Sequence, residues 1–394
     1  MKKSLIKKIA SLALVGVMAV GTLVGCGGGT SDAGGDNANV EKKGTIMWLS
    51  NLSAGLAYEN ALSYAENFLN EIGYEVKVVY ADMYNDPDAN LNAVRNGMTS
   101  DVVGLVSSVD GGIINIMEEY PELYVVGYNT DMNAIYGEGG AAAALQQNEK
   151  FLGTICDGHF DGTLTGQQMA NSVIEKGYTK VATIAFPGYA YPNLPVADAA
   201  FRAAIAEHNK TAATPIEIVG ESKVLEFSPL EESWFLEEGN GDLDAIVCFC
   251  AGIDFVYPTV KSAIANGTCS ADTKLLTGGF NDDEAIIADI GGEGVIQYVN
   301  FSPAENFGYS LELLTRGLEG TLYADFVAER VDSLEYAIDS KEDIENVMSK
   351  GFTGTGDLTL LQITNEEVHA AESFEALQAL YMSEQLSVDG LKNK

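Results

Sequence analysis

Residues 45–80 read TIMWLSNLSAGLAYENALSYAENFLNEIGYEVKVVY, and they indicate the fold class of the chain. It begins and ends with short apolar runs, TIMWLS and EVKVVY, that have the length of strands. Between them, apolar side chains recur at helical spacing at Leu62, Ala65, Phe68, Leu69 and Ile72. A strand, a helix and a second strand in this order predict two parallel strands joined by a crossover helix.

The same alternation continues along the rest of the chain. Apolar runs at 102–106 and 123–128 are separated by stretches of helix length, and after FLGTIC at 151–156 the pattern starts again. The second series contains the runs KVATIAF, PIEIVG, AIVCF and KLLTGGF. We therefore predict an α/β fold with two doubly wound parallel sheets in tandem, whose ligands bind at the carboxyl ends of the strands.

The N-terminus has the pattern of an export signal. Four lysines precede an apolar run over residues 9–25, which ends in Leu-Val-Gly-Cys. That ending resembles the bacterial lipobox, in which the cysteine is lipidated and becomes the mature N-terminus. We expect residues 1–25 to be a lipoprotein signal peptide and residues 26–43 to be the lipidated Cys26 and a flexible tether, with the protein on the extracytoplasmic face of the membrane. A plain anchor helix with an incidental cysteine is the alternative.

Charge and motifs exclude several classes of function. The formal net charge is -35, with 57 acidic against 22 basic residues, so the surface repels nucleic acid. Three stretches begin like calcium loops but lack the required glycine and glutamate. The motifs of nucleotide-binding loops, zinc proteases, serine hydrolases and dehydrogenases are absent from the sequence. We predict no metal, no cofactor, no nucleic-acid partner and no enzymatic activity.

The remaining cysteines are expected to be free and buried. They are Cys156, Cys248, Cys250 and Cys269, and the middle pair lies two residues apart on the run AIVCFC. In an exported protein a bridge from Cys248 or Cys250 to Cys269 is the alternative.

Several stretches together resemble one known family. They are TSDVVGLVSSVDGG at 99–112, LTGQQMANSVIEKGYTKVATIA at 164–185, LLTGGFNDDEA at 275–285 and GVIQYVNFSPAENFGYSLELLTRGLEG at 294–320. Over residues 44 to about 338 the chain resembles the type 1 periplasmic solute-binding proteins of ABC transporters, near the ribose- and galactose-binding members. The resemblance implies two doubly wound lobes joined by a three-segment hinge. The N-terminal lobe should contain residues 44–155 and 301–330, and the C-terminal lobe residues 156–300 and 331–338, with residues 339–394 as a C-terminal extension.

The resemblance also implies a function. The expected role is that of the substrate-binding subunit of an ABC importer, which acts as a monomer, captures a small solute by hinge closure and delivers it to an ABC permease. Where sugar binders carry an arginine and an Asn-Asp pair, this chain has Ala197 and Gly252-Ile253. We therefore expect an uncharged solute, a sugar being the first choice. A nucleoside is an alternative solute, and a receptor module for a membrane sensor kinase is an alternative role.

Candidate ligand-binding residues follow from strand ends and from matches to the family. Aromatic and amide side chains dominate them, which suits a neutral ligand with polar edges. After Gly279 we expect Asp283 and Glu284 to complement the dipole of the helix that begins there. Phe280 and Asn281, which precede them, are then the candidates for contact with the ligand. The set comprises Trp48, Asn51, Tyr58, Ser107, Tyr128, Asn129, Phe160, Asp161, Tyr189, Phe249, Gly252, Phe280, Asn281 and Asn300.

Overall fold

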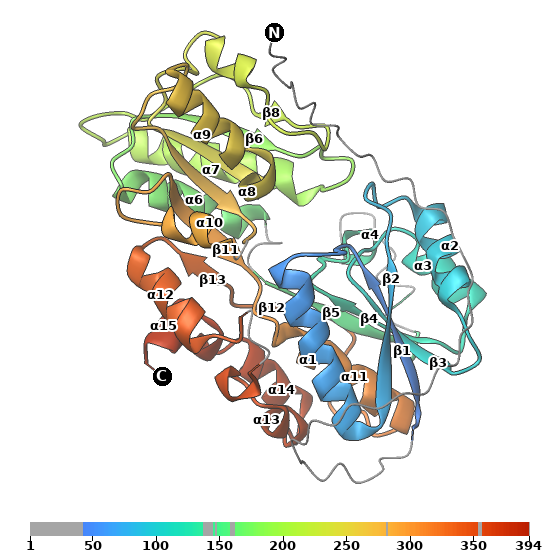
Figure 1. The fold of residues 1–394 in the computed structure, drawn as a ribbon. Helices are drawn as coiled ribbons and strands as arrows, with labels where there is room; N and C mark the ends of the chain where they lie inside the picture. The colour runs from blue at the N-terminus through green and yellow to red at the C-terminus, as the bar shows by residue number, and fades with distance from the viewer. Residues whose placement is uncertain are drawn as a thin grey trace, which may run out of the picture. The chain divides into compact units, whose positions relative to one another are not determined.

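In the computed structural model of the chain, strands and helices alternate and form two separate sheets (Figure 1). The structure describes residues 42–136, 145, 148–157, 162–280, 283–353 and 357–393, all within the unit Val40–Lys394. Cys26 and the predicted signal peptide lie outside these residues. In the described part of the chain, no helix has the length and apolar character needed to cross a membrane.

The first sheet has six parallel strands in the order β12-β5-β4-β3-β1-β2. The strands are β1 (Gly44–Ser50), β2 (Tyr74–Tyr80), β3 (Val102–Ser107), β4 (Tyr124–Tyr128), β5 (Phe151–Asp157) and β12 (Arg330–Ser333). Side chains of β1 alternate between its two faces, which are both covered. Ile46 and Trp48 pack with α1 (Leu56–Ile72) and α11 (Asn306–Glu319), whereas Met47 and Leu49 pack with α2 (Pro87–Gly97) and α3 (Ile113–Glu119). A short α4 (Asn133–Tyr136) follows β4.

The second sheet has the order β13-β11-β10-β9-β6-β7, with β8 paired to β6 and only β13 antiparallel. Its strands are β6 (Lys180–Ala185), β7 (Glu217–Ile218), β8 (Lys223–Val224), β9 (Ala245–Ala251), β10 (Lys274–Gly278), β11 (Ile296–Phe301) and β13 (Tyr336–Ile338). Its helices are α6 (Gly162–Glu175), α7 (Asn193–Asn209), η1 (Glu232–Leu236), α8 (Gly252–Phe255), α9 (Tyr257–Asn266) and α10 (Glu284–Ala288). The predicted α/β fold with two doubly wound sheets is confirmed.

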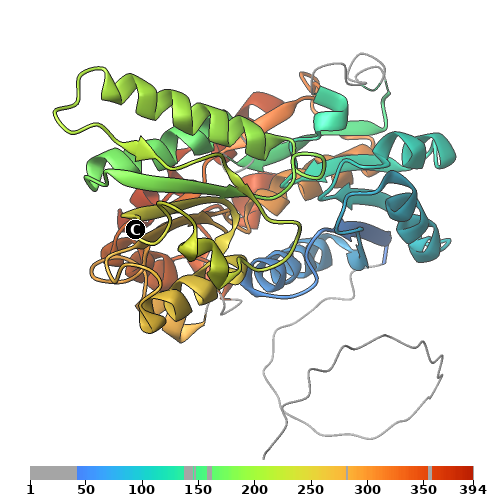
Figure 2. The same ribbon diagram turned by 90° about the horizontal axis from the view of Figure 1, so that it is seen from above.

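Helices α6 and α7 lie side by side because of two glycines (Figure 2). A Cβ atom on Gly162 would come within 2.2 Å of the Asn193 carbonyl oxygen, and one on Gly166 within 2.2 Å of the Ala197 carbonyl oxygen. Glycine thus lets the two helix backbones approach more closely than any other residue would.

The two sheets define a first and a second lobe, and the chain passes between them three times before the extension. It crosses between β5 and α6, between β11 and α11, and between β12 and β13. The boundary expected between residues 330 and 331 falls inside β12, because Arg330–Ser333 pairs in parallel with Thr154–Asp157 of the first sheet.

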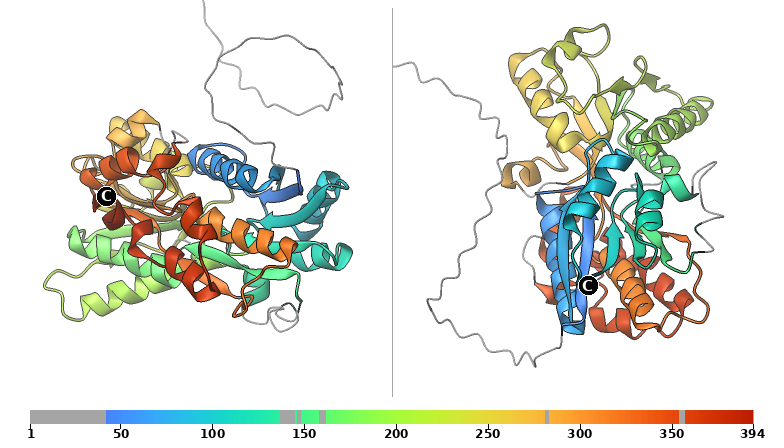
Figure 3. Two further views of the ribbon diagram at one scale, coloured as in Figure 1. Left: turned by 90° about the horizontal axis from the view of Figure 1, so that it is seen from below. Right: turned by 90° about the vertical axis from the view of Figure 1, so that its right-hand side faces the viewer.

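The C-terminal extension is helical in its described part. It contains α12 (Lys341–Lys350), η2 (Leu358–Leu360), α13 (Asn365–His369), α14 (Phe374–Tyr381), η3 (Glu384–Leu386) and α15 (Val388–Lys392), and α13 and α14 lie against α11 (Figure 3). The sequence FTGTGDLTLLQIT at 352–364 suggests an added strand, and the described residues of this stretch contain none, so that expectation is wrong. Residues 368–386 suggest an amphipathic helix, and the structure has one only over α14, with a break at residues 370–373 before it. Thr364 forms a capping box and Ser373 caps α14, so two separate short helices begin there.

The four cysteines beyond Cys26 are all buried and free, as expected. Neither of the alternative bridges to Cys269 is formed, and the Cys269 thiol instead donates to Thr273 Oγ1 at 3.2 Å.

Candidate functional site

Both sheets reverse their strand order beside their first strand, and this defines where a ligand should bind. The reversal falls between β1 and β3 in the first lobe and between β6 and β9 in the second. At such a point the loops that follow neighbouring strands diverge to opposite faces of the sheet, which opens a crevice outside the carboxyl ends. A ligand is therefore expected to contact the side chains at these two carboxyl edges.

Aromatic rings form a column at the edge of the first lobe. Trp48 is only 2% exposed and stacks on Tyr58 with the ring centroids 5.6 Å apart, and its Nε1 donates to Ser108 Oγ at 2.9 Å. Tyr58 is half-buried, and its hydroxyl lies 3.2 Å from that of Tyr80, which is 51% exposed. Trp48 therefore supports the column from the core, while Tyr58 and Tyr80 present its outer part.

Two other predicted residues of the first lobe point into its core. The Ser107 hydroxyl is buried and donates to the Val109 carbonyl oxygen at 2.6 Å. Tyr128 is buried and stacks on Phe307 at 4.1 Å between centroids. Both end central strands, but their side chains face the helix layers. Ser107 and Tyr128 therefore contribute to the packing of the lobe. The predicted Asn51 differs from them because it is exposed, in the loop after β1.

Polar side chains gather after β3 and β4. Asp110 Oδ1 accepts from Asn85 Nδ2 and Asp110 Oδ2 from the Ala134 amide, each at 2.7 Å. Asn129 has a φ of 48°, in the left-handed region that asparagine tolerates better than most residues. Its Oδ1 is buried and has no hydrogen-bond partner among the described residues. Asn129 therefore offers an unused acceptor at the carboxyl edge of the sheet.

A half-buried carboxyl group, that of Asp131, lies two residues further on. Burial, followed by the nearby charge of Asp110, raises the pKa of Asp131 from 3.8 to about 6. Arg330 acts in the opposite direction on this pKa, and its Nε donates to Asp332 Oδ1 at 2.7 Å. Asp332 Oδ1 also accepts from the Cys156 thiol at 3.3 Å, so an ion pair lies where the chain leaves the first sheet.

Asp131→Asn should stabilise the protein near pH 7 by about 3 kcal/mol. The folded-state pKa of Asp131 is raised, so ionisation opposes folding fully above pH 6, and this penalty disappears as the pH falls from about 6 to 3.8. Urea denaturation at several pH values measures the difference, with the exposed Asp272→Asn as control. A stability gain independent of pH would contradict this explanation.

The edge of the second lobe carries a cluster of four aromatic rings. Phe186 follows β6 and lies 5.1 Å from Phe227, 5.0 Å from Phe255 and 5.9 Å from Tyr191, between ring centroids. Phe227 has a φ of 54°, which is unusual for a bulky residue and stores strain. We call these four residues the aromatic cluster.

One ring of the first lobe reaches this cluster. Tyr84, in the loop between β2 and α2, is 52% exposed and meets Phe227 edge-on, with the centroids 5.1 Å apart and the planes at 90°. Beside it, the predicted Tyr189 is 69% exposed and donates through its hydroxyl to Glu226 Oε2 at 3.0 Å. The aromatic cluster and Tyr84 thus link the two carboxyl edges.

The other predicted residues of the second lobe have structural contacts. Phe249 is fully buried against Phe201, and the Gly252 amide donates to Thr277 Oγ1 at 2.9 Å. The half-buried Phe280 stacks on Phe301 at 4.6 Å. The buried Asn300 donates to Glu335 Oε2 at 2.9 Å. Phe160, Asp161 and Asn281 lie outside the described residues.

The expected role of Asp283 at a helix start is confirmed. Its side chain accepts from the Ala285 amide at 2.8 Å and caps α10, with Glu284 in the first turn of that helix.

Five further aromatic residues at the two carboxyl edges are not among the predicted ligand-binding residues, namely Tyr80, Tyr84, Phe186, Phe227 and Phe255. Each except Phe227 ends a predicted strand or follows it within a few residues, so a systematic search of all strand ends for aromatic residues could have found four of them. Phe227 follows the two-residue strand β8, which no apolar run announces.

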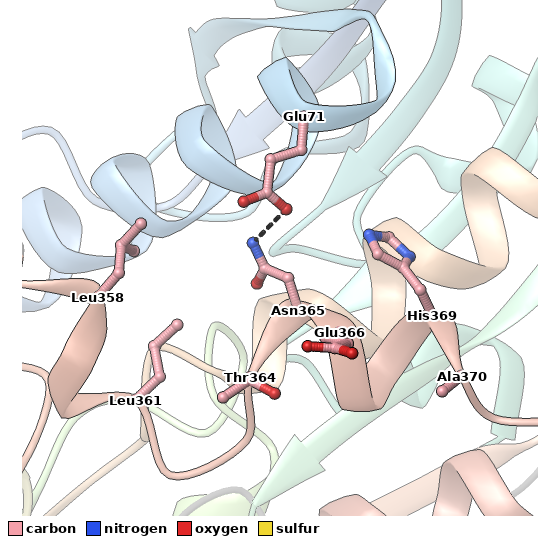
Figure 4. A pocket seen from close by; sticks show the side chains of 8 residues that line it. All are labelled: Glu71, Leu358, Leu361, Thr364, Asn365, Glu366, His369 and Ala370. Atoms are coloured by element: carbon pink, nitrogen blue, oxygen red, sulfur yellow. Dashed lines mark hydrogen bonds between the residues drawn. The ribbon is translucent and has the colours of Figure 1, made fainter. Parts of the chain in front are cut away.

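Two hollows lie elsewhere, beside the extension. One of about 600 Å³ is lined by Glu71, Leu358, Leu361, Thr364, Asn365, Glu366, His369 and Ala370 (Figure 4). A neighbouring one of about 470 Å³ shares Glu71 and His369 with it. Figure 4 shows Asn365 pointing toward Glu71, to which its Nδ2 donates at 3.0 Å. Neither hollow includes a predicted ligand-binding residue, and both follow the seam between the extension and the first lobe.

Comparison with known proteins identifies the class of fold. No family model matches the chain, and no curated protein sequence matches it. Among solved structures, an ABC transporter solute-binding protein from Burkholderia graminis C4D1M in complex with D-arabinose matches with a TM-score of 0.58 at 14% identity, over 77% of this chain and 97% of that one. A solute-binding protein from Agrobacterium vitis bound with α-D-tagatopyranose matches with a TM-score of 0.57 at 14% identity, over 78% and 97%.

A third match shows how widely this fold is used. A putative ribose operon repressor from Burkholderia thailandensis matches with a TM-score of 0.53 at 14% identity, over 75% of this chain and 98% of that one. The fold of this chain is therefore that of the type 1 periplasmic-binding proteins, as the sequence motifs predict. Proteins with different roles thus share this fold.

Proposed function

We propose that this protein is the substrate-binding subunit of an ABC importer and captures a small neutral solute, a sugar, between its two lobes by hinge closure. One observation carries the proposal. The carboxyl edges of both sheets present aromatic rings, and Tyr84 of one lobe meets the aromatic cluster of the other. Neighbours with the same fold are solute-binding proteins solved with D-arabinose and α-D-tagatopyranose, which supports a sugar.

The chemistry of the edges favours an uncharged ligand. Flat ring faces such as those of Tyr58 and Tyr80 pack against the C–H face of a sugar or against a base. Asn129 supplies an acceptor for a ligand hydroxyl or N–H group. A nucleoside is the second candidate, because aromatic rings lie at both edges and a planar base stacks well on them.

A thermal-shift screen of sugars, nucleosides and amino acids tests the proposal. A ligand at 100 times its dissociation constant should add about 2.7 kcal/mol to the free energy of unfolding. Stabilisation by a monosaccharide or a nucleoside, with no effect of charged amino acids, is the expected result. Stabilisation by charged amino acids alone would overturn the proposed ligand class.

We further propose that Cys26 is lipidated and anchors the protein on the outer side of the cell membrane, where the ABC permease receives the solute. The Leu-Val-Gly-Cys ending of the apolar N-terminal run supports this. Cys26→Ser should abolish the lipid mass on the mature N-terminus and release the protein or leave it uncleaved, as mass spectrometry and cell fractionation will show. Ala33→Ser, in the tether, serves as control. Wild-type protein that carries no lipid yet stays in the membrane would contradict the proposal.

A further inference from the structure

The C-terminal extension passes between the two lobes twice more. Its first helix, α12, packs on β13 of the second sheet. Phe352 and apolar side chains of the described residues 357–386 pack on the first lobe, and α15 returns to β13 and α12. Together with the three earlier crossings, the chain therefore passes between the lobes five times.

The fourth crossing is short and anchored at both ends. Val347, in α12, is fully buried with Ile338 of β13. Five residues later Phe352 is buried in the first lobe, where its ring lies 6.3 Å from that of Tyr64 in α1. Five residues of extended chain span at most about 17 Å.

The fifth crossing is shorter still. Leu386 is fully buried in the core of the first lobe, and Val388 is buried in that of the second. Two residues of chain span about 7 Å, so these two anchors stay close whatever the lobes do. Lys392 Nζ lies 2.7 Å from Asp343 Oδ1 and Lys350 Nζ donates to the Leu391 carbonyl oxygen at 3.1 Å, which fixes α15 to α12.

Polar contacts fix the middle of the extension to the first lobe. Arg316 of α11 donates to the carbonyl oxygen of His369 at 3.2 Å, and the His369 ring lies 2.8 Å through Nδ1 from Glu312 Oε2. The Phe374 amide donates to Asp325 Oδ1 at 2.9 Å. Such part-buried and charge-assisted contacts are costly to break, so the middle of the extension moves with the first lobe.

One residue of the extension contacts both lobes. The Gln362 amide donates to Glu305 Oε1 at 3.1 Å, next to α11, while its side-chain Nε2 hydrogen-bonds to the hydroxyl of Tyr336 in β13. Gln362 therefore lies where the extension spans the hinge.

We infer that the extension is a strap that limits how far the lobes open in the ligand-free protein. The inference rests on the proposed hinge-closing function. Leu386 and Val388, whose backbones are at most about 7 Å apart, must stay close during any motion of the lobes. The lobes can therefore rotate only about axes that pass near these two residues, and they sample fewer open arrangements than three crossings alone would permit. Fewer open arrangements mean less freedom lost on closure, and hence tighter binding of the solute.

The test lengthens the strap without removing either anchor. About ten Gly and Ser residues are inserted between Leu386 and Ser387, which leaves Ser387 as the cap of α15. Spin labels on Glu118→Cys in α3 and Ala206→Cys in α7, both exposed, report the distance between the lobes. Of the five native cysteines, four are buried, and Cys26 is replaced by serine in all labelled variants. The same insertion between Ala213 and Thr214, an exposed loop of the second lobe alone, is the matched control.

In the ligand-free protein, the strap insertion should lengthen the mean distance between labels and broaden its distribution, and the control insertion should change neither. Affinity for the solute found in the screen should fall roughly threefold to tenfold. Leu391→Ala loosens the packing of α15 without changing the chain length, and it should also lengthen and broaden the distances between labels. This variant replaces the insertion in the test if the insertion variant does not fold. If the strap-insertion variant folds and its distances between labels equal those of the wild type, the strap proposal is wrong. Because the distances are measured without ligand, they test it even if the proposed solute proves wrong.

Discussion

Trp48→Ala should lower the free energy of unfolding by about 3–5 kcal/mol. The indole is buried between β1 and α11, stacks on Tyr58, meets Tyr128 and Phe307 edge-on, and donates to Ser108. Truncation would remove these contacts, leave a large cavity and orphan the serine hydroxyl. Urea denaturation followed by circular dichroism measures the loss.

The matched control is Tyr58→Ala, one step further out in the same column. Tyr58 is half-buried, so its truncation should cost less stability than that of Trp48 and instead weaken solute binding. The only other tryptophan, Trp234, is buried in the second lobe and reports unfolding in both variants. If Trp48→Ala kept its stability but lost affinity, Trp48 would be a ligand contact and not a core residue.

Asn129→Gly should weaken binding of the solute by about 1–3 kcal/mol, which is roughly a tenfold to hundredfold loss of affinity. The substitution removes the unused Oδ1 acceptor, while glycine adopts a φ of 48° without strain. The change therefore isolates the side-chain amide from the backbone conformation. Isothermal titration calorimetry with the solute from the screen measures it.

Two further substitutions separate the possible reasons for such a loss. Asn129→Asp keeps an acceptor of nearly the same shape and should retain most of the affinity for a ligand that donates a hydroxyl group. Asn129→Ala adds backbone strain to the loss of the amide, so it should be the least stable of the three. Wild-type affinity in the glycine variant would remove Asn129 from the site.

The fold could be predicted because its signal is local and repeated. The run TIMWLS is continuously apolar from Ile46 to Leu49, and β1 is buried on both faces because helices cover both sides of the sheet. Each later run repeats that pattern. The extension could not be predicted in the same way, because its short helices are defined by caps such as Thr364 and Ser373 and by anchors in two different lobes.

The candidate site could be predicted only in part. Strand ends are visible in the sequence, so the positions of Tyr58 and Asn129 near the edge follow from it. The direction of a side chain at a strand end depends on the alternation of faces, and this turns Ser107 and Tyr128 into the core. Contacts between distant segments, such as Tyr84 with Phe227, depend on how the lobes meet and leave no trace in local periodicity.

The contact between α6 and α7 has a consequence for how this protein can evolve. At Gly162 and Gly166 the facing atoms are backbone carbonyls of α7, so no change of a neighbouring side chain can make room for a larger residue. Most core positions can drift through paired substitutions, in which one side chain shrinks as its neighbour grows. These two positions have no such partner, and a lineage that loses either glycine must move a whole helix to keep the second lobe folded.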